Sequence, residues 1–417
     1  MKNKKLKINE TTKQISITVK HIFPTFAPMQ INIKRGKESS IERGHPWIFS
    51  GAIHSIDGTP KNGDVVDVYG AQKQFLARGH YQNGTISVRV LTRQADENID
   101  QNFWNLRLKW ALELRKKLGL FRPSNSICRL VHGEGDMLPG LIIDWFNGVA
   151  VIQCHSLGML ASLDFIKNAL LENLGPEVKA IYSKSAETLA HDSGAKNDYL
   201  YGSCDTPHIA EEYGHKFSID WITGQKTGFF IDQRENRRLL AQYAEGKTIL
   251  NAFCYSGGFS VTALEAGAAH VDSLDSSAKA ILLTEANIAL NGLEKNHSSI
   301  TADAMQHIKQ LDKEYDIIIL DPPAFAKHRE ARHKAVQGYK RLNAHAMTYI
   351  KPGGILFTFS CSQVVDKALF NNTIIAAAME SGRQVRILEQ LHQPADHPIN
   401  AFHPEGEYLK GLVVEVL

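Results

Sequence analysis

Two side chains with catalytic potential follow predicted strands in the C-terminal half of the sequence. Cys361 lies between two serines at the end of an apolar run, and Asp321 follows the apolar run 315–320 and precedes Pro322 and Pro323. We expect both side chains at the carboxyl ends of parallel strands, where an open α/β sheet binds ligands. A thiol in such a position can act as a nucleophile, and a neighbouring carboxyl group can stabilise the charge that develops.

A glycine-containing turn earlier in the chain indicates a nucleotide-like ligand. It follows the apolar residues 248–250, and Gly257 allows both a tight turn and a close approach of the ligand to the backbone. About twenty residues further on, the predicted strand 270–274 ends in Asp275, which is placed to accept hydrogen bonds from ribose hydroxyls. A third predicted strand ends in Asp303. The turn lacks the glycine pattern of dehydrogenases and the lysine of a P-loop.

The order of these features resembles the class I S-adenosylmethionine-dependent methyltransferases. The last two predicted strands, 383–389 and 411–416, form a closing hairpin, whereas a dehydrogenase would continue with another helical crossover. The chain is most similar to the RlmI-like family, which makes 5-methylcytosine in 23S ribosomal RNA. The similarity covers residues 30–417, and the stretches 396–398 and 404–410 are specific to it. The implied fold is α/β, a Rossmann-like methyltransferase domain preceded by a small β-barrel and a central α+β domain.

This resemblance implies the chemistry of Cys361 and Asp321. Carbon 5 of cytosine is a poor nucleophile, but a Cys361 thiolate that adds to carbon 6 turns the ring into an enamine that can attack a methyl group. Asp321 would bind the amino and ring-nitrogen edge of the base, and Pro322 and Pro323 stiffen the substrate-binding loop. A buried structural cysteine is the alternative for Cys361. Cys254, in the glycine turn, is interpreted as packing beside the cofactor.

The expected cofactor is S-adenosylmethionine, with Asp275 on the ribose and Asp303 near the adenine amino group. In the family, the loop that precedes the methyltransferase sheet folds over the cofactor, and Phe230 and Gln233 would line its methionine end. Ordinary core packing is the alternative for this loop. The family usually carries an aspartate where this chain has Asn251, which removes a charge near the methionine ammonium. The predicted cofactor-binding residues are Phe230, Gln233, Asn251, Phe253, Tyr255, Ser256, Gly257, Asp275, Ser276, Asp303 and Asp321.

Residues 29–105 predict a small β-barrel, because short alternating segments are separated by Asp-Gly and Asn-Gly turns. The run 43–50 resembles the start of the family's PUA domain, an RNA-binding module. Trp47 and Phe49 in this run are expected to be core aromatics rather than base-stacking surfaces. The residues expected to contact phosphates are Arg35, Arg43 and Arg78.

The remaining segments complete the predicted domain organisation. Residues 1–28 form a basic extension, either a solvated tail or a phosphate-binding face, and the family usually begins near Met29. Residues 106–215 are assigned to a linker helix and a central α+β domain, and residues 216–417 to the methyltransferase domain. Asp232 is a plausible N-cap for the helix that leads into that domain.

The linker helix is predicted between residues 98 and 119. Its apolar residues at helical spacing are Phe103, Leu106, Trp110 and Leu114. In the central domain, the spacing of His132, Glu134 and Asp136 favours a glycine-rich loop over a metal site.

Amino-acid composition indicates the cellular compartment and the kinds of partner to expect. The net charge is only +3, the hydrophobic fraction of 43% suits full cores, and no apolar run approaches the length of a membrane span. The five cysteines form no Cys-x-x-Cys pair, which favours reduced thiols in the cytoplasm over zinc or disulfides. We therefore expect a cytoplasmic protein with no metal and no membrane partner; the resemblance adds 23S ribosomal RNA as partner and a homodimer.

Two other functions fit parts of the sequence. An Asp-Pro-Pro motif also occurs in methyltransferases that act on a base nitrogen, including guanine, where no nucleophilic cysteine is needed. The chain could also be a non-catalytic RNA-binding factor that retains a cofactor fold. The presence of Asp275, Asp303, Asp321 and Cys361 argues against this second alternative.

Overall fold

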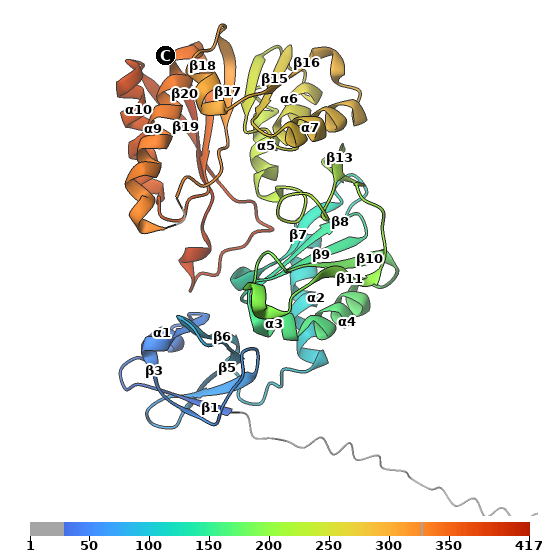
Figure 1. Cartoon of the computed structure of the whole chain (residues 1–417), viewed down its shortest axis with the longest axis vertical. Coiled ribbons are helices and arrows are strands. Elements are labelled where there is room, and N and C mark those ends of the chain that lie inside the picture. The colour runs from blue at the N-terminus through green and yellow to red at the C-terminus, as the bar shows by residue number, and fades with distance from the viewer. Residues whose placement is uncertain (1–28, 327) are drawn as a thin grey trace, which may run out of the picture.

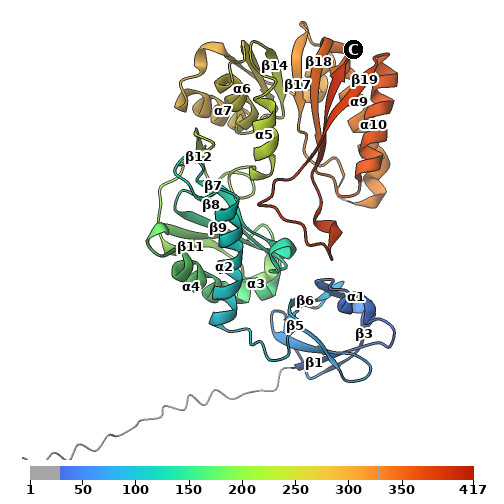
Figure 2. The same ribbon diagram turned by 180° about the vertical axis from the view of Figure 1, so that it is seen from behind.

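The computed structural model describes residues 29–326 and 328–417, so the predicted basic extension 1–28 lies outside the described residues. A small β-sheet structure lies at one end, a central α+β region in the middle, and a large mixed sheet with helices at the other end (Figure 1). The view from behind shows that one long C-terminal segment leaves the large sheet and reaches the other two regions (Figure 2).

The N-terminal region is a six-stranded sheet that curls into a small barrel (Figure 1). The strand order is β2-β6-β5-β4-β1-β3, and a short helix, α1 (Ser39–Glu42), follows the first strand. The predicted β-barrel is therefore confirmed, although the alternating pattern revealed only three of its strands. The strands are β1 (Met29–Ile33), β2 (Trp47–Phe49), β3 (Ile53–Asp57), β4 (Val65–Tyr69), β5 (Phe75–Tyr81) and β6 (Ile86–Thr92).

The predicted linker helix is α2 (Gln101–Lys117), which begins at an N-cap, Asp100, whose carboxylate accepts hydrogen bonds from two backbone N–H groups. The four apolar residues at helical spacing are not all buried. Leu106 and Trp110 are about 40% exposed, whereas Trp104 and Arg115 are fully buried. The helix buries two arginines beside its apolar residues, and a hydrophobic pattern cannot detect a buried charge.

The central region is a five-stranded sheet, order β11-β10-β9-β8-β7, covered by helices α2, α3 (Leu157–Ala161) and α4 (Leu163–Leu174). A separate hairpin joins it to the large sheet. The central strands are β7 (Ile127–His132), β8 (Leu141–Phe146), β9 (Val149–Cys154), β10 (Ala180–Lys184) and β11 (Asn197–Gly202), and the hairpin is β12 (His208–Glu212) with β13 (His215–Ile219).

The large sheet has the order β16-β15-β14-β17-β18-β20-β19, in which β20 alone is antiparallel to its neighbours. This order and the closing hairpin confirm the predicted fold class. The strands are β14 (Thr248–Ala252), β15 (His270–Asp275), β16 (His297–Thr301), β17 (Tyr315–Leu320), β18 (Ile350–Ser360), β19 (Val385–His392) and β20 (Lys410–Val416). The helices are α5 (Arg234–Leu240), α6 (Gly258–Glu265), α7 (Ala278–Leu290), α8 (Ala304–Ile308), α9 (Arg332–Tyr349) and α10 (Lys367–Ser381).

The segment between β19 and β20, residues 393–409, connects the three regions and is called here the connecting segment. Its Asp396 forms a buried ion pair with Arg234 of α5, at 2.8 Å for both oxygens, and its Oδ2 accepts a hydrogen bond from the backbone of Arg129 in β7. Arg115 of α2 donates to the Asp396 carbonyl at 2.7 Å. At the N-terminal sheet, the ring of Phe402 packs directly over Gly44. One segment therefore holds all three regions together.

Candidate active site

Five parallel strands have their carboxyl ends along one edge of the large sheet. In sheet order they are β16, β15, β14, β17 and β18. The direction of the strand order reverses between β14 and β17, and a crevice at such a point is where an open α/β sheet binds its ligand. The predicted residues that follow these strands therefore share one edge, as their positions in the sequence implied.

The turn after β14 is held in an unusual backbone conformation. Phe253 and Tyr255 have positive φ angles of 61° and 47°, and Gly257 has 72°. Side chains with a Cβ rarely adopt this region, and such strain is found at ligand sites where the surroundings enforce it. The enforcement is visible: the Asp275 carboxylate accepts hydrogen bonds from the backbone N–H of Tyr255 at 3.1 Å and of Ser277 at 2.9 Å.

The acidic residues at this edge remain accessible to a ligand. Asp275 is half-buried, Ser276 beside it is exposed, and Asp303 is exposed just beyond β16. Asp303 also caps α8, because its Oδ1 accepts a hydrogen bond from the Gln306 backbone at 2.9 Å. A carboxylate has about four acceptor positions, so both aspartates retain capacity for hydroxyl or amino donors. These acceptors are compatible with the hydroxyl and amino donors of a nucleoside.

Asn251 and Ser256 lie deeper in the fold. Asn251 is buried, and its amide donates to Ser260 Oγ of α6 at 2.8 Å, while its Oδ1 has no partner among the described residues. Ser256 is buried, and its carbonyl accepts a hydrogen bond from Asn287 of α7. Both residues therefore position the turn, and Asn251 also leaves one acceptor without a partner.

The loop that precedes α5 folds against the glycine turn. The Tyr255 hydroxyl accepts a hydrogen bond from the Gln225 backbone at 3.0 Å, and the rings of Phe230 and Tyr255 meet edge to face at 5.0 Å. Phe229 is buried in the core, whereas Phe230 is half-buried at the turn, so the core-packing alternative applies to Phe229 alone. Gln233 is buried near Asp321.

Asp232 does not have the capping role that its position suggested. The N-cap of α5 is Gln233, with no side-chain capping bond, and a 3-10 turn precedes the helix. The Asp232 carboxylate instead accepts a hydrogen bond from the Tyr408 hydroxyl at 2.8 Å. This bond links the loop that precedes α5 to the connecting segment.

The Asp321 loop and the Cys361 loop are joined by direct hydrogen bonds. Ser362 Oγ donates to the Ala326 carbonyl at 2.7 Å and accepts from the Ala326 N–H at 3.1 Å. Because β17 and β18 are adjacent, Asp321 and Cys361 leave the sheet side by side. Cys361 is half-buried, so its thiol is not a sealed core cysteine. In the Asp321 loop, Pro322 is buried and Pro323 is exposed.

The ionisation of these two groups is perturbed. Burial and the nearby charge of Asp232 raise the pKa of Asp321 to about 7. A hydrogen bond from Gln233 acts in the opposite direction and lowers this pKa. Burial and then the Asp321 carboxylate raise the pKa of the Cys361 thiol to about 11, while Lys410 acts in the opposite direction. Near neutral pH, Asp321 is thus present both with and without its proton.

Lys410 is a site residue that the sequence did not single out. It pairs in register with Ser360, and its buried ammonium donates to the Ser362 carbonyl at 2.7 Å and the Val365 carbonyl at 2.8 Å. Burial lowers the pKa of Lys410 to about 8, against the opposing charge of Cys361. The only signal in the sequence was its place at the end of the 404–410 stretch.

The other thiol near the site, Cys254, has a different environment. It is buried, its Sγ lies 3.5 Å from Thr284 Oγ1, and burial raises the pKa of the thiol to about 12. It packs under the glycine turn, in accord with its interpretation as a packing residue.

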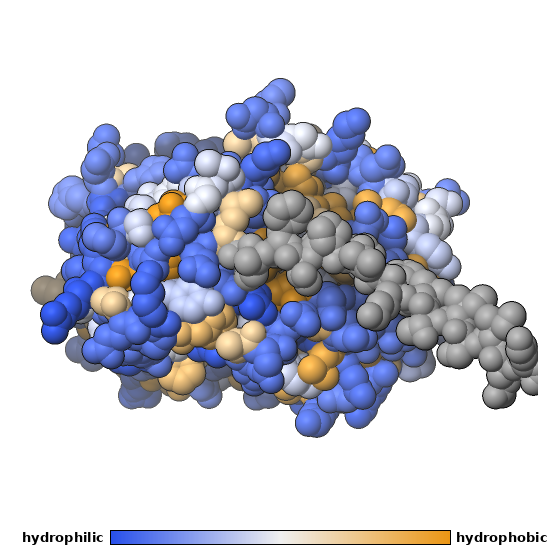
Figure 3. Space-filling model, turned by 90° about the horizontal axis from the view of Figure 1, so that it is seen from below, coloured by the Kyte–Doolittle hydropathy of each residue, from blue (hydrophilic) through white to orange (hydrophobic). Residues whose placement is uncertain are grey.

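The three arginines expected to contact phosphates differ in availability. Arg35 and Arg43 are exposed on the N-terminal sheet structure, whose outer end is mainly hydrophilic (Figure 3). Arg78 instead forms a two-point ion pair with Asp67, at 2.6 and 3.1 Å, and donates to the Glu97 carbonyl. Because its guanidinium is already bound within the protein, Arg78 is not available to contact phosphate.

The aromatic residues of the N-terminal sheet also depart from expectation. Phe49 is 41% exposed, and Trp47 is half-buried against the connecting segment, with its indole N–H donating to Glu134 at 2.8 Å. Neither is a core aromatic of the barrel, because both lie on the side that faces the rest of the molecule.

The residues of the predicted glycine-rich loop are each engaged elsewhere. Asp136 pairs with Arg115, Glu134 accepts the Trp47 indole, and His132 packs against His397 with ring centroids 4.9 Å apart. His132, Glu134 and Asp136 therefore do not converge on a common point.

Comparison with known families agrees with the fold. Residues 128–410 match the family model described as S-adenosylmethionine-dependent methyltransferase, and residues 31–93 match the model of a PUA-like domain. The matched regions contain the glycine turn, the two acidic strand ends, Asp321 and Cys361. The class is thus that of S-adenosylmethionine-dependent methyltransferases with a PUA-like domain, and the predicted cofactor is confirmed.

Curated relatives narrow the family. The chain is 38% identical to ribosomal RNA large subunit methyltransferase I of Shewanella denitrificans, over 93% of this chain and 99% of the relative. It is 40% identical to the protein of the same name from Aeromonas hydrophila, over 92% and 98%. The chain belongs to this family.

Solved structures share the same fold. A Streptococcus mutans protein assigned to the SAM-dependent methyltransferases has a TM-score of 0.79 at 22% identity, covering 93% of this chain and 100% of that one. SMU.776, solved in complex with SAH, has a TM-score of 0.80 with the same identity and coverage. Within the described residues, no helix is long and apolar enough to cross a membrane.

Proposed function

We propose that this chain methylates carbon 5 of a cytosine in large-subunit ribosomal RNA, through a covalent bond between Cys361 and the base. The observation that carries this proposal is the junction of the Asp321 and Cys361 loops through Ser362 and Ala326. It holds a half-buried thiol and a carboxyl group side by side at the ligand-binding edge. A nitrogen-directed methyltransferase needs no such thiol, because nitrogen carries its own lone pair.

The proposed reaction proceeds in balanced steps. The Cys361 thiol gives its proton to a base as its sulfur bonds to carbon 6 of cytosine. Ring nitrogen 3 takes up a proton, which it releases after methyl transfer, so that the ring becomes an enamine with a nucleophilic carbon 5. S-adenosylmethionine supplies an electrophilic methyl group, which carbon 5 takes as the carbon–sulfur bond of the cofactor breaks. A base then removes the proton from carbon 5, and the bond between Cys361 and carbon 6 breaks to regenerate the double bond.

Asp321 and Lys410 would control the charges in these steps. With a pKa of about 7, a protonated Asp321 is available at neutral pH to donate to the ring nitrogen of cytosine, which neutralises the charge that sulfur addition places on the ring. The Lys410 ammonium, held next to the Cys361 loop by two carbonyls, favours the thiolate over the thiol. Even with Lys410 in place the pKa of the thiol is about 11, so the thiol is mostly protonated at neutral pH and must lose its proton as the sulfur bonds to carbon 6.

The proposed cofactor contacts follow from the exposed acidic strand ends. Asp275 would bind the ribose hydroxyls and Asp303 the adenine amino group, while Phe230 and Gln233 line the methionine end. The PUA-like region would contact RNA phosphates through Arg35 and Arg43. We also propose domain boundaries after residues 105 and 215, a cytoplasmic location and a homodimer. Sedimentation of the purified protein tests the homodimer.

Cys361→Ala tests the proposed mechanism. We expect this variant to lose methylation of a large-subunit RNA transcript while its affinity for S-adenosylmethionine stays within about twofold of wild type, because Cys361 lies outside the cofactor turn. RNA that carries 5-fluorocytosine should form a covalent adduct with the wild-type protein, since fluorine prevents the proton loss that releases the enzyme. Denaturing gels and mass spectrometry detect this adduct.

Cys254→Ala is the matched control and should still form the adduct. If Cys361→Ala remains active, or if the adduct persists without Cys361, methylation of a base nitrogen becomes the better assignment. Nucleoside mass spectrometry of the product separates 5-methylcytosine from a methylated guanine directly.

A further inference from the structure

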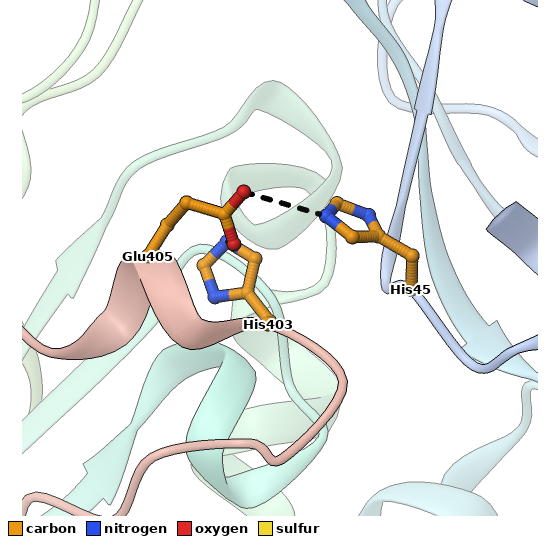
Figure 4. Close-up of side chains that lie close together, drawn as sticks. All are labelled: His45, His403 and Glu405. Atoms are coloured by element: carbon orange, nitrogen blue, oxygen red, sulfur yellow. Dashed lines mark ion pairs between the residues drawn. The ribbon is translucent and has the colours of Figure 1, made fainter.

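One group of metal-ligand side chains lies away from the active site, where the N-terminal sheet meets the connecting segment. His45 precedes β2, and His403 and Glu405 belong to the connecting segment; the three side chains point toward one another (Figure 4). Each offers one ligand atom, and these atoms all lie within 4.8 Å of one another. Among the residues that the structure describes, no other group of three histidine, cysteine, aspartate or glutamate side chains converges in this way.

His403 is a buried imidazole without hydrogen-bond partners. Only 3% of its surface is exposed, and neither Nδ1 nor Nε2 has a partner among the described residues. Its ring packs against Trp47, with centroids 4.3 Å apart, so the side chain is firmly placed. A buried polar group without a partner costs free energy, and a bound ion would remove that cost.

His45 is oriented so that one nitrogen is free. Its Nδ1 lies 3.1 Å from the Trp47 carbonyl oxygen and 3.1 Å from the Trp47 backbone nitrogen. The Trp47 N–H donates to Nδ1, which places the ring proton on Nε2, the nitrogen that faces Glu405. A cation at Nε2 would require that proton to move to Nδ1, where the Trp47 carbonyl can accept it. Metal-binding histidines commonly use such a hydrogen bond on the second nitrogen to fix the ring and its tautomer.

The carboxylate of Glu405 lies beside both imidazoles (Figure 4). Its Oε1 is 3.9 Å from His45 Nε2, and its Oε2 is 3.8 Å from His403 Nε2, both too long for hydrogen bonds. Ligands of a tetrahedral zinc ion lie about 3.3 Å apart. The three ligand atoms here lie within 4.8 Å of one another, so binding would draw the three side chains closer together. Glu405 is 56% exposed, which gives it the freedom to move and leaves solvent access for a water ligand.

We propose that His45, His403 and Glu405 bind a divalent transition-metal ion of the zinc class, with water as the fourth ligand. Two imidazoles and one carboxylate form a ligand set that zinc uses in proteins, whereas magnesium and calcium prefer oxygen ligands alone. One ligand comes from the N-terminal sheet and two from the connecting segment. The ion would therefore fasten the PUA-like region to the segment that also contacts the methyltransferase and central regions.

The test is calorimetric titration of the EDTA-treated full-length protein with Zn²⁺ alone. Wild type should bind one ion at this site. Glu405→Gln and His45→Gln should each weaken that binding at least about tenfold, because even the loss of a residue that only hydrogen-bonds a metal ligand weakens metal binding by that factor. Zn²⁺ should also raise the melting temperature of wild type and not that of Glu405→Gln, because only a folded, intact site gains from the ion. Mg²⁺ should do neither.

Glu405 is exposed, so its replacement should leave the metal-free melting temperature unchanged. Zinc also binds thiols, and Cys204 Sγ lies 3.3 Å from His208 Nδ1. Cys204→Ser is therefore the matched control and should bind Zn²⁺ at the proposed site as wild type does. Equal Zn²⁺ affinity in wild type, His45→Gln and Glu405→Gln, or no binding by wild type, would overturn the proposal. The readout is metal binding, so it does not depend on the reaction proposed above.

Discussion

At the residue scale, Asp275 joins the proposed recognition of the cofactor to the shape of the glycine turn. Its carboxylate holds two backbone N–H groups and keeps acceptor capacity for ribose hydroxyls. Asp275→Ala should weaken S-adenosylmethionine binding by about 10- to 150-fold, because a hydrogen bond to a charged group contributes about 1.5–3 kcal/mol. Calorimetric titration measures this loss. An unchanged affinity would remove Asp275 from the cofactor site.

Lys410 gives the reactivity of Cys361 a predictable dependence on pH. The pKa of Lys410 is lowered to about 8 and that of Cys361 is raised to about 11, so between pH 6 and pH 8 the lysine is charged and the thiol is mostly protonated. Lys410→Met should slow alkylation of Cys361 by iodoacetamide, since removal of the cation raises the thiol pKa further. The difference from wild type should be largest below pH 8 and narrow above it, where wild-type Lys410 loses its own charge.

Lys410→Arg is the matched control, because it keeps a positive charge at the same position. Melting temperatures of both variants separate loss of the charge from loss of the two carbonyl contacts. An equal alkylation rate for wild type and Lys410→Met at pH 7 would show that the lysine only supports the loop.

At the element scale, Asp396 determines how the connecting segment is anchored. Its carboxylate pairs with Arg234 and accepts from the Arg129 backbone. Burial alone would raise its pKa, but Arg234 and His397 hold that pKa well below the usual value. Asp396→Asn should lower the free energy of unfolding by about 3–5 kcal/mol at pH 7, because a buried Arg234 loses its counter-charge. Urea unfolding followed by fluorescence measures the change.

The same pair predicts the effect of acid. Since the folded pKa of Asp396 is depressed, its contribution is present above the unfolded pKa of about 3.9 and is lost as pH falls below that value. The stability difference between wild type and Asp396→Asn should therefore shrink from pH 7 to pH 3. A constant difference would mean that Asp396 acts through packing and not through charge.

Elements with a plain hydrophobic pattern were predictable from the sequence, and elements with buried charge were not. The strands that end in Asp275, Asp321 and Cys361 are apolar runs between turns, and the closing hairpin distinguished the fold class. The buried face of α2 was misjudged because Arg115 is fully buried in an ion pair. Asp232 was misjudged because its partner, Tyr408, lies far away in the sequence.

At the scale of the whole molecule, the proposed RNA contacts predict a strong dependence on salt. Arg35→Ala with Arg43→Ala should weaken RNA binding and reduce the slope of log affinity against log salt concentration by about 1.5, because each phosphate contact on a single strand contributes about 0.7. Filter binding at several salt concentrations measures the slope. Arg386→Ala, an exposed arginine of β19, is the matched control and should leave the slope unchanged.

Contacts between the regions were beyond the reach of the sequence. Trp47, Glu134 and His403 come from three segments, and nothing in their local patterns indicates that they meet. Such contacts depend on the path of the connecting segment, which follows from the tertiary fold. The metal-binding side chains proposed above are therefore dispersed in the chain, whereas the sequence argument about metals considered only the spacing of the cysteines and the neighbouring residues His132, Glu134 and Asp136.

The connecting segment also bears on the order in which the protein is assembled during synthesis. Domains generally fold as units while the chain is made, the N-terminal ones first. Here the connecting segment, residues 393–409, is translated after every strand of the N-terminal and central regions. Those two regions can thus form early, and the contacts of Asp396 and Phe402 are added only once this segment has been made. A chain that ended before residue 393 would keep the direct contact of Trp47 with Glu134 but would lose the ion pair of Asp396 with Arg234 and the packing of Phe402 over Gly44.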